Sequence, residues 1–456
     1  MVSYPLHPCS LAEAQLMYND KESPLTLTLL DDELSLQVLQ FSGHEALNQP
    51  YRFDIEAIGL APTISLDRLL QQPVYLNFGD DTGIHGILHS ASREHRGPHR
   101  TGYHLVLVPY LQNLDRQRSR RVFHQLGVPA ILRQLLEENA LPEDSYRFEL
   151  PSGRYPIRAF CIQFDESDLA FLQRLCEEEG IHYHFEHRRD GHVLVLADDS
   201  LSFPQEPLLM PFHGDPPHDL NVPVISELFQ RHTSPPLAAH STPQPLRSEQ
   251  PSRRILERLR CLHWQIQGQS NQSELRAGQI VQVSEHPLPT FNDQWLLTEI
   301  RHQGQQPSIL AEERIDIVRR YTNRFTAIPW STVFRPALTH ARPRIPGFQT
   351  ARVLGPPGQP SPQDERGRIQ VRLWPTPASD TGESSGIWLP VIFATPEGRI
   401  DPSRLPLGGC EVLISFLDSD PDRPVLCATA SPPPAPRIAD EPRNDARLLL
   451  DWLVNR

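Results

Sequence analysis

The sequence predicts a mainly β protein that carries one α+β insertion, and three observations support this fold class. Many short runs alternate apolar and polar residues with period two, which is typical of strands. Proline accounts for 47 of the 456 residues, about twice its usual share of roughly 5%, and this density breaks long helices and favours turns and strand edges. Between residues 122 and 191 the apolar spacing changes and becomes helical.

Composition narrows the classes of function. The formal net charge is -13, which argues against general binding to nucleic acid, because such binding requires a basic surface. No apolar run approaches the roughly 20 residues of a membrane-spanning helix, and residues 1–20 lack the basic and apolar regions of a signal peptide. We therefore expect a soluble protein that is made in the cytoplasm and has two to four domains.

The N-terminal part is predicted to form a β-barrel or sandwich. Residues 1–24 are irregular and polar, and we expect them to form a leader. After them, short alternating runs are separated by turn residues, a spacing typical of these folds. The predicted strands are residues 25–29, 34–39, 51–58, 74–78, 83–92 and 102–108.

Two amphipathic helices are predicted in the insertion. Pro129 suits the first turn of one helix, whereas the other has Asp165 as its expected cap and Gly180 as its expected end. The apolar stripes are Ile131, Leu132, Leu135 and Leu136 in the first helix, and Leu169, Phe171, Leu172, Leu175 and Cys176 in the second.

Three glutamates, residues 177–179, crowd the C-terminal end of the second helix. The helix dipole disfavours acids at that end, at a cost of roughly 0.3–1 kcal/mol for each exposed carboxylate. They could form a site for a partner, but we interpret them as a solvated helix end, since exposed dipole effects are small and screened.

The rest of the chain is again predicted to be mostly strands. Residues 181–186 and 193–196 form an expected hairpin across the turn at 189–191. A Pro-, Ser- and Gln-rich loop is expected at residues 235–251, and a proline-rich crossing segment at 329–346. The remaining predictions are strands at 261–267, 280–283 and 295–302, a β region at 351–430, a stiff spacer at 431–436 and a short amphipathic helix at 446–454.

The search for a catalytic, cofactor or metal site is negative. The sequence holds no G-x-S-x-G elbow, no phosphate-binding loop and no G-x-G-x-x-G fingerprint. His182 and His184 share a strand face and could reach one zinc ion together with His187 or His192. A tetrahedral site needs at least three protein ligands, and the spacing fixes no third one. We therefore expect these histidines to form a polar outer strand face.

Other residues with possible chemistry are also expected to be structural. His85 and His89 lie four residues apart on a strand, which is too far for one ion. The six cysteines have no regular spacing, and we expect them to be reduced, with Cys410 and Cys427 as the one pair that could be close. Residues 418–424 lack the glycine and the final glutamate of a calcium loop, so we expect a tight acidic turn there.

Several segments together resemble one family. Residues 155–187, YPIRAFCIQFDESDLAFLQRLCEEEGIHYHFEH, are similar to the signature of VgrG proteins, the tip spikes of bacterial type VI secretion systems. Further similar segments follow in the family's order and span residues 25–430. They are residues 41–45 (FSGHE), 103–109 (YHLVLVP), 321–325 (YTNRF), 351–355 (ARVLG), 364–371 (DERGRIQV) and 411–424 (EVLISFLDSDPDRP).

The resemblance implies a fold similar to phage tail hubs: two hub-type β-barrels with an α+β insertion, then an oligonucleotide/oligosaccharide-binding (OB) barrel, which Gly367 and Trp388 would shape. It also implies a homotrimer whose six barrels cap a hexameric Hcp-like tube. The expected domains are a leader (1–24), a first barrel (25–110), the insertion (111–200), a second barrel (201–335), the OB domain (336–430), and a spacer with a short helix (431–456).

The resemblance further implies a structural protein that binds baseplate proteins, uses no enzyme chemistry or cofactor, and leaves the cytoplasm through the secretion apparatus without a signal peptide. Two features depart from the family: the OB region is short between residues 388 and 409, and no β-helix needle follows residue 430. We therefore expect a PAAR-type tip protein, an adaptor or an effector near the C-terminal helix, with Leu449, Trp452 and Leu453 as candidate contacts. The alternatives are the tail hub of a phage-like contractile particle and a cell-wall-active enzyme.

Overall fold

The first barrel is closed by six antiparallel strands. The computed structural model describes residues 25–31, 34–60, 62–79, 82–97, 99–214, 222–234, 249–307, 319–374, 386–391 and 405–429. Around the first barrel the strand order is β1-β4-β5-β6-β3-β2, and β2 pairs with β1 to close it. These strands are β1 (Thr26–Leu29), β2 (Leu34–Ala46), β3 (Gln49–Leu60), β4 (Pro73–Gly79), β5 (Thr82–His95) and β6 (Arg100–Val108), with the short helix α2 (Leu66–Leu69) before β4.

Alternation along each strand fills this barrel, as the sequence predicts. In β3, Tyr51, Phe53 and Ile55 are buried, whereas Arg52 and Asp54 between them are exposed. Successive side chains of a strand point to opposite faces, so one face of the strand builds the core and the other meets water.

The insertion is an α+β layer, as predicted. Its sheet has the order β10-β11-β8, and the helices α3 and α4 carry the buried apolar stripes that the sequence predicts. Its elements are the 3-10 helix η1 (Tyr110–Asp115), α3 (Val128–Glu138), the 3-10 helix η2 (Glu143–Ser145), β8 (Tyr146–Glu149), α4 (Asp168–Glu179), β10 (His182–His187) and β11 (His192–Ala197); the strands β7 (Arg118–Leu126) and β9 (Arg158–Ser167) pair as a separate ribbon.

The second barrel repeats the strand order of the first. Around the barrel, the order β12-β13-β14-β17-β16-β15 corresponds to β1-β2-β3-β6-β5-β4, and a single bridge between Phe212 and Ile225 joins β12 to β13. The barrel is therefore nearly closed, and β12 is parallel to β15, whereas β4 is antiparallel to β1. The strands are β12 (Leu208–Pro211), β13 (Ile225–His232), β14 (Trp264–Ser270), β15 (Ile280–Ser284), β16 (Gln294–Gln305) and β17 (Arg320–Pro329).

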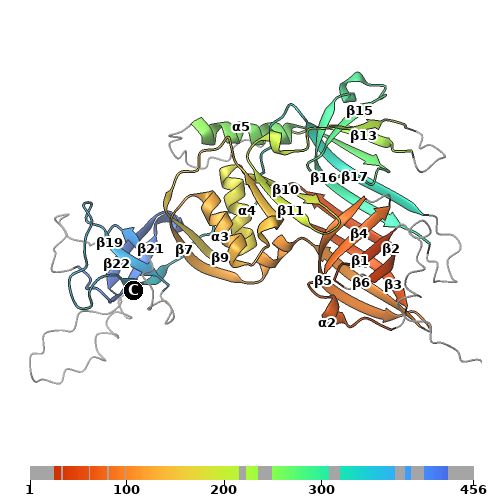
Figure 1. Cartoon of the computed structure of the whole chain (residues 1–456). Coiled ribbons are helices and arrows are strands. Elements are labelled where there is room, and N and C mark those ends of the chain that lie inside the picture. The colour runs from red at the N-terminus through yellow and green to blue at the C-terminus, as the bar shows by residue number, and fades with distance from the viewer. Residues whose placement is uncertain are drawn as a thin grey trace, which may run out of the picture. The chain divides into compact units, whose positions relative to one another are not determined.

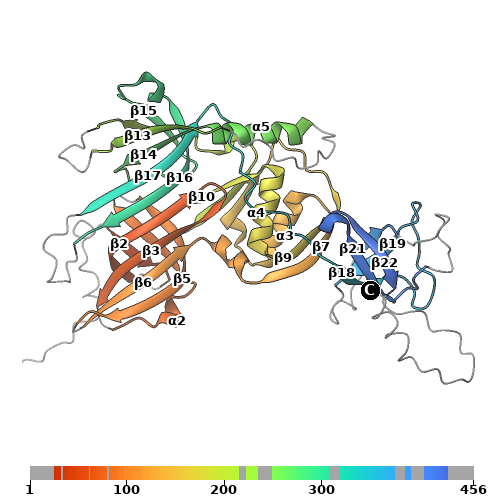
Figure 2. The same ribbon diagram turned by 180° about the vertical axis from the view of Figure 1, so that it is seen from behind.

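The two barrels share one sheet, because β16 pairs with strands of both. Residues 294–296 of β16 pair with β15, and residues 299–305 pair with β2, while β17 follows the other edge of β16 throughout. Figures 1 and 2 show the barrels side by side, with β2 next to β16.

A second compact unit contains the C-terminal sheet. By packing, the double-barrel unit comprises Met1–Ser119, Leu126–Arg158 and Asp165–Arg342, and the C-terminal unit comprises Arg120–Gln125, Ala159–Phe164 and Pro343–Arg456. The sheet order is β20-β19-β18-β21-β22, and a bridge between Val391 and Leu426 joins its two edges. Its strands are β18 (Phe348–Val353), β19 (Ile369–Leu373), β20 (Ile387–Leu389), β21 (Glu411–Phe416) and β22 (Pro424–Thr429).

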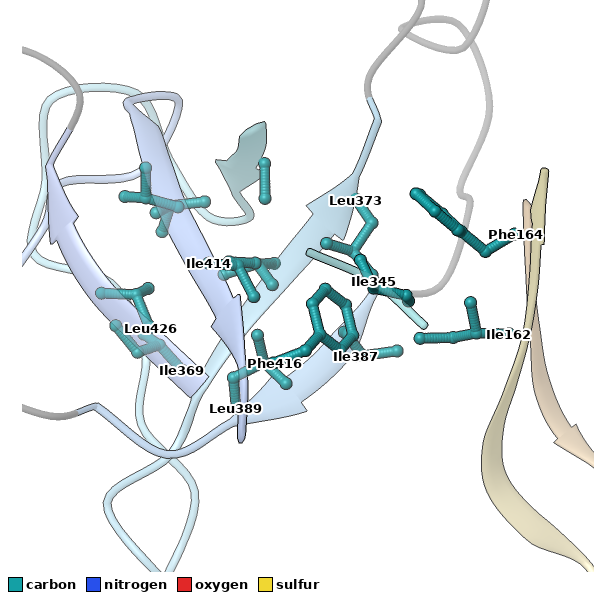
Figure 3. Close-up of a cluster of buried hydrophobic side chains, with 14 residues drawn as sticks. Ile162, Phe164, Ile345, Ile369, Leu373, Ile387, Leu389, Ile414, Phe416 and Leu426 are labelled. Carbon is teal, nitrogen blue, oxygen red and sulfur yellow. The ribbon is translucent and has the colours of Figure 1, made fainter. Parts of the chain in front are cut away.

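The β7–β9 ribbon contributes to the core of the C-terminal unit. Ile162 and Phe164 of β9 pack with Ile345, Ile387 and Phe416 in one buried cluster (Figure 3). The sequence prediction grouped this ribbon with the insertion, whereas packing groups its central residues with the five-stranded sheet. Five strands support the OB fold predicted for residues 336–430, which stays a prediction.

Two element predictions were wrong. Residues 249–251 were expected in a loop and residues 261–263 in a strand, but both belong to the helix α5 (Glu249–His263), and β14 begins only at Trp264. The expected helix cap Asp165 lies in β9 with a φ of 52°, and the side chain of Ser167 accepts the hydrogen bond from the N–H of Ala170 instead. None of the helices in the described ranges has the length and apolarity needed to cross a membrane.

Candidate functional site

The outer face of the shared sheet is polar and concave. Eight strands follow one another in the order β5-β6-β3-β2-β16-β17-β14-β13. Residues of all of these strands except β13 line a hollow of about 1030 Å³. The first barrel contributes Asp54 and Glu56 to this hollow, whereas the second contributes Arg301, Arg320 and Arg324. Part of this charge is balanced within the chain, because Asp54 pairs with Arg52, Glu56 with Arg96 and Arg301 with Glu299.

Each end of this eight-stranded sheet is an edge strand. In the described part of the chain, residues 90–95 of β5 pair only with β6, and residues 227–232 of β13 pair only with β14. The exposed side chains include Phe229, which is 62% exposed on β13. A row of unpaired backbone N–H and C=O groups is a template for another strand, so these edges are candidate assembly surfaces.

Glycine and phenylalanine pairs hold the strands of the shared sheet close together. Gly304 of β16 lies opposite Phe41 of β2, and a Cβ atom at Gly304 would come within 2.2 Å of the Phe41 ring. Gly43 and Phe53 form the same kind of pair between β2 and β3, because a Cβ atom at Gly43 would lie 2.0 Å from the Phe53 ring. A ring that covers a facing glycine fixes the register of two strands.

A buried polar contact also joins the barrels. The ring nitrogen Nε2 of His302, on β16, lies 2.8 Å from Oε1 of Glu45, on β2. Nδ1 of the same ring lies 2.6 Å from the hydroxyl of Tyr321, on β17. Burial lowers the pKa of His302, and the Glu45 carboxylate opposes that shift.

The glutamates at residues 177–179 are not a solvated helix end, and that interpretation was wrong. The helix α4 ends at Gly180 with a φ of 71°, and all three carboxylates are paired within the double-barrel unit. Glu177 is 4% exposed. Glu178 contacts Arg174 at 3.1 Å and Arg342 at 3.0 Å; Glu179 contacts Arg158 and Arg254, each at 2.7 Å.

Glu177 fastens the crossing segment that follows β17. Its carboxylate accepts hydrogen bonds from the backbone N–H of Thr339 and of His340, each at 2.8 Å. It also lies 2.8 Å from Nδ1 of His340 and contacts the hydroxyl of Thr339. Several hydrogen bonds to a buried carboxylate offset the free-energy cost of removing its charge from water. The signature glutamate is therefore an internal anchor for this segment.

Arg335 makes a second attachment of the same segment. Its Nε donates to Glu257 of α5 at 2.7 Å, and one terminal nitrogen donates to the backbone carbonyls of Gly180 at 3.1 Å and Asp198 at 2.7 Å. Two buried attachments thus hold residues 335–340, just before the chain enters the C-terminal unit at Pro343.

In the candidate metal site, His182, His184 and His192 are buried and His187 is half-buried, contrary to the expected outer face. His182 is stacked on Phe203, and His184 also packs against that ring. His192 Nδ1 lies 2.9 Å from His85 Nδ1. Tyr51, which belongs to the first barrel, contacts the rings of His187 and His192. Both faces of the β10–β11 hairpin are therefore covered, which strand alternation alone does not reveal.

These histidines are held neutral. Burial is the main cause in each case: it lowers the pKa of His85 and of His184 to about 4, and that of His192 to about 3. The N–H of Tyr110 donates to Nε2 of His192, so Nδ1 of His192 carries the hydrogen and faces His85. Across the described ranges, no three His, Cys, Asp or Glu side chains are placed to share a metal ion.

Other predicted residues fall into three groups. Leu169, Phe171, Leu172 and Leu175 are buried, as expected. The cysteines in the described part, including Cys410 and Cys427, form no disulfide. The candidate partner residues Leu449, Trp452 and Leu453, like Cys9, lie outside the described residues.

The helix α5 and its charged contacts were not predicted from the sequence. Arg254 and Glu257 of α5 are buried and pair with Glu179 and Arg335. The spacing of Ile255, Leu259 and Leu262 is helical, and this signal could have found the helix.

Comparison with known proteins identifies the family. The family model described as phage tail baseplate hub (GPD) matches residues 44–240 and 226–308. The type VI secretion system spike protein VgrG5 of Pseudomonas aeruginosa is 37% identical over 436 residues, covering 86% of this chain and 55% of that protein. VgrG4b of the same organism is 35% identical over 457 residues, covering 90% and 56%. The chain thus spans about half the length of these relatives.

Solved structures agree on the fold. An Escherichia coli protein, c3393, is described as a component of the type VI secretion system with structural similarity to the T4 bacteriophage tail proteins gp27 and gp5. It matches with a TM-score of 0.69 at 25% identity, covering 86% of this chain and 97% of that one. A chain of the Francisella PdpA-VgrG complex has a TM-score of 0.58 at 8% identity, covering 94% and 74%, which shows a similar fold alone. The chain therefore belongs to the phage tail baseplate hub (GPD) family, and within the matched length it is similar to VgrG spike proteins.

Proposed function

We propose that the chain is the hub of a type VI secretion spike, which caps a hexameric Hcp-like tube as a homotrimer. The observation that carries this proposal is the sheet through both barrels, which ends in an edge strand on each side. Contact between β13 of one copy and β5 of the next is heterologous, and such contacts close into a ring when the rotation permits. Three copies would place six barrels around one axis, matching the six subunits of the tube.

The mechanism we infer is mechanical. A contracting sheath would supply the energy, and this chain would supply rigidity and docking surfaces, including surfaces for baseplate proteins. The anchors of the crossing segment at Glu177 and Arg335 support this role, because they tie the barrels to the segment that enters the C-terminal unit. The chain would be made in the cytoplasm and leave through the apparatus without a signal peptide, in line with the spike proteins to which it is similar.

Adjacent proline substitutions test the ring. Along an antiparallel strand, neighbouring N–H groups point to opposite edges. One of the two substitutions Phe229→Pro and Gln230→Pro therefore removes an N–H that donates to β14. The other removes an N–H at the free edge of β13. In native mass spectrometry, the unmodified chain is expected at three times the 51.9 kDa chain mass. The edge proline is expected to give a folded monomer, and the other to lower the melting temperature. A trimer that survives both substitutions would contradict the proposed edge pairing.

A tip protein of the PAAR type, an adaptor or an effector is proposed to bind residues 446–454, through Leu449, Trp452 and Leu453. Deletion of residues 431–456 tests this proposal, with secretion of the chain itself and of neighbouring effectors as the two readouts. Loss of effector export with normal export of the truncated chain is expected, and unchanged effector export would exclude this docking site.

Two alternatives have their own tests. The match to phage tail hubs supports a second candidate function, the hub of a phage-like contractile particle. Capture of Hcp hexamers by the purified chain would favour the secretion spike. Capture of phage tube protein alone would favour the phage-like particle. One relative, from Vibrio cholerae, is named actin cross-linking toxin VgrG1, and the chain covers 41% of that protein. We propose a role without catalysis for this chain, so release of soluble fragments from peptidoglycan would contradict it.

A further inference from the structure

The helix α5 buries its charged side. Arg254, Glu257 and Cys261 are the most buried side chains on this helix. Arg254 pairs with Glu179 at 2.7 Å, and Glu257 pairs with Arg335 at 2.7 Å. A typical surface helix does the opposite and places its apolar stripe against the core. Ion pairs therefore hold α5 on the double-barrel unit, and its apolar side chains do not contribute to that attachment.

The apolar side of α5 faces solvent. Ile255 is 45% exposed, Leu256 56% and Leu262 39%, and Leu259 between them is half-buried. Residues 255, 259 and 262 follow the spacing of one helix face, and 256 lies beside them. Both views show α5 at the rim of the double-barrel unit, beyond α4 (Figures 1 and 2). A contiguous exposed apolar stripe of this kind marks an interaction site more often than single exposed leucines do.

Basic side chains border this stripe. Arg253, Arg260 and His263 are exposed and follow the stripe along one side, since residues 253, 260 and 263 lie three and seven positions apart on the helix. Arg253 contacts Glu257 at 2.8 Å, whereas Arg260 has no ion pair among the described residues. The surface is therefore locally basic on a chain whose net charge is -13.

A groove continues the stripe at the C-terminal end of α5. It has a volume of about 580 Å³ and is lined by Leu262 together with Ile328, Phe334, Arg231 and Arg258. Ile328 and Phe334 belong to one apolar cluster, and Arg231 is exposed at the groove. Apolar and cationic side chains thus line part of the groove. The carboxylates of Glu177 and Glu299 also line it, and they are paired with His340 and Arg301 respectively.

We propose that α5 and this groove bind an acidic amphipathic helix of a partner protein. Apolar side chains of the partner, spaced at i, i+4 and i+7, would cover Ile255, Leu259 and Leu262, as in recognition of a helix by an apolar groove. Carboxylates beside them would meet Arg260 and Arg231, which sets the preference for an acidic partner. The surface lies within one chain, so binding does not depend on the proposed ring.

Binding of synthetic helical peptides to the full chain tests the proposal by fluorescence anisotropy. Three labelled peptides of about 18 residues, long enough to form a marginal helix, are compared: leucine at the stripe spacing with glutamates beside it, the same peptide with lysines, and a scrambled acidic peptide. The first is expected to bind tightest. Leu256→Ser combined with Leu259→Ser is expected to weaken it at least about tenfold, and Arg260→Glu to shift the preference toward the lysine peptide.

Leu209→Ser is the matched control, because Leu209 is 71% exposed on β12 and lies outside α5. It is expected to leave peptide binding unchanged, and circular dichroism checks that all variants fold. Equal binding of the three peptides, or no effect of the α5 double variant, would overturn the proposal. Two further results would also overturn it: self-association of the chain that α5 substitutions abolish, with no peptide binding, and binding only to anionic phosphatidylglycerol vesicles.

Discussion

At the scale of single residues, Glu177 shows how an acid can be stable at the unfavourable end of a helix. Its carboxylate is surrounded by hydrogen-bond donors from Thr339 and His340, a segment more than 150 positions away in the sequence. Charge-assisted hydrogen bonds of this kind are about twice as strong as neutral ones. They offset the small repulsion of the helix dipole.

Replacing Glu177 by glutamine should loosen the crossing segment. Glutamine keeps the shape of the side chain but weakens its charge-assisted hydrogen bonds, so we expect a loss of about 1–3 kcal/mol in the free energy of unfolding. Denaturant unfolding measures the loss, and limited proteolysis should show faster cleavage between residues 336 and 346. Glu206→Gln, at an exposed position, is the control and should change neither. Equal behaviour of the two variants would mean that Glu177 is not an anchor.

Sequence reasoning could identify these residues but not their surroundings. The histidines of β10 sit at alternate positions, which normally separates an outer face from an inner one. In this protein, Tyr51 of the first barrel packs on one side of the hairpin and Phe203 on the other. The partners of residues 177–179 come from α5 and the crossing segment. Such long-range contacts leave no local pattern in the sequence.

At the scale of elements, prediction succeeded where the pattern follows burial. All six strands of the first barrel were found from their alternation, although the predicted strand 34–39 covers only the start of β2. In the second barrel, β14, β15 and β16 were found, whereas β12, β13 and β17 were not predicted. The helix α5 was missed although its apolar residues have helical spacing, because its two ends were assigned to the preceding Pro-, Ser- and Gln-rich loop and to the following strand. The cap of α4 was misplaced because Asp165 and Ser167 are both good capping residues, and only the backbone conformation, with a φ of 52° at Asp165, excludes the first.

The backbone conformation at the end of α4 requires a glycine at position 180, and this requirement can be tested. Its φ of 71° lies in the left-handed region, and a Cβ atom there would come within 3.2 Å of Arg254 and 3.3 Å of Arg335. We therefore expect Gly180→Ala to lower the free energy of unfolding by about 1–2 kcal/mol. Gly191→Ala is the control, because a Cβ atom at Gly191 meets nothing within 4 Å, and its effect should stay within about 0.5 kcal/mol. Chemical denaturation measures both, and equal losses would contradict this account.

At the scale of the whole molecule, the neutral buried histidines predict acid sensitivity. An unfolded histidine has a pKa of about 6.5, whereas burial lowers that of His85 and His184 to about 4 and that of His192 to about 3. Below pH 6.5 the unfolded chain binds protons that the folded chain does not. Stability is therefore complete above that pH and is lost as the pH falls toward 4, by up to about 1.4 kcal/mol per pKa unit and group.

Unfolding midpoints in urea, measured from pH 7.5 to pH 5, test this prediction. The midpoint should fall steadily below pH 6.5, before most carboxylates titrate. In the double variant His85→Asn with His192→Asn, the slope should be shallower, whatever its stability at pH 7.5. A midpoint that stays constant down to pH 5 would show that these histidines are not held neutral.

The sharing of β16 between two barrels has a thermodynamic consequence. Unfolding of the first barrel would remove the partner of residues 299–305 of β16, and unfolding of the second would remove the partner of β2. Neither barrel keeps all of its strand pairing when the other is unfolded. The two barrels should therefore unfold in one cooperative transition. In calorimetry of the full chain, both barrels should therefore melt within one heat-absorption peak, and separate peaks for the two barrels would contradict this expectation.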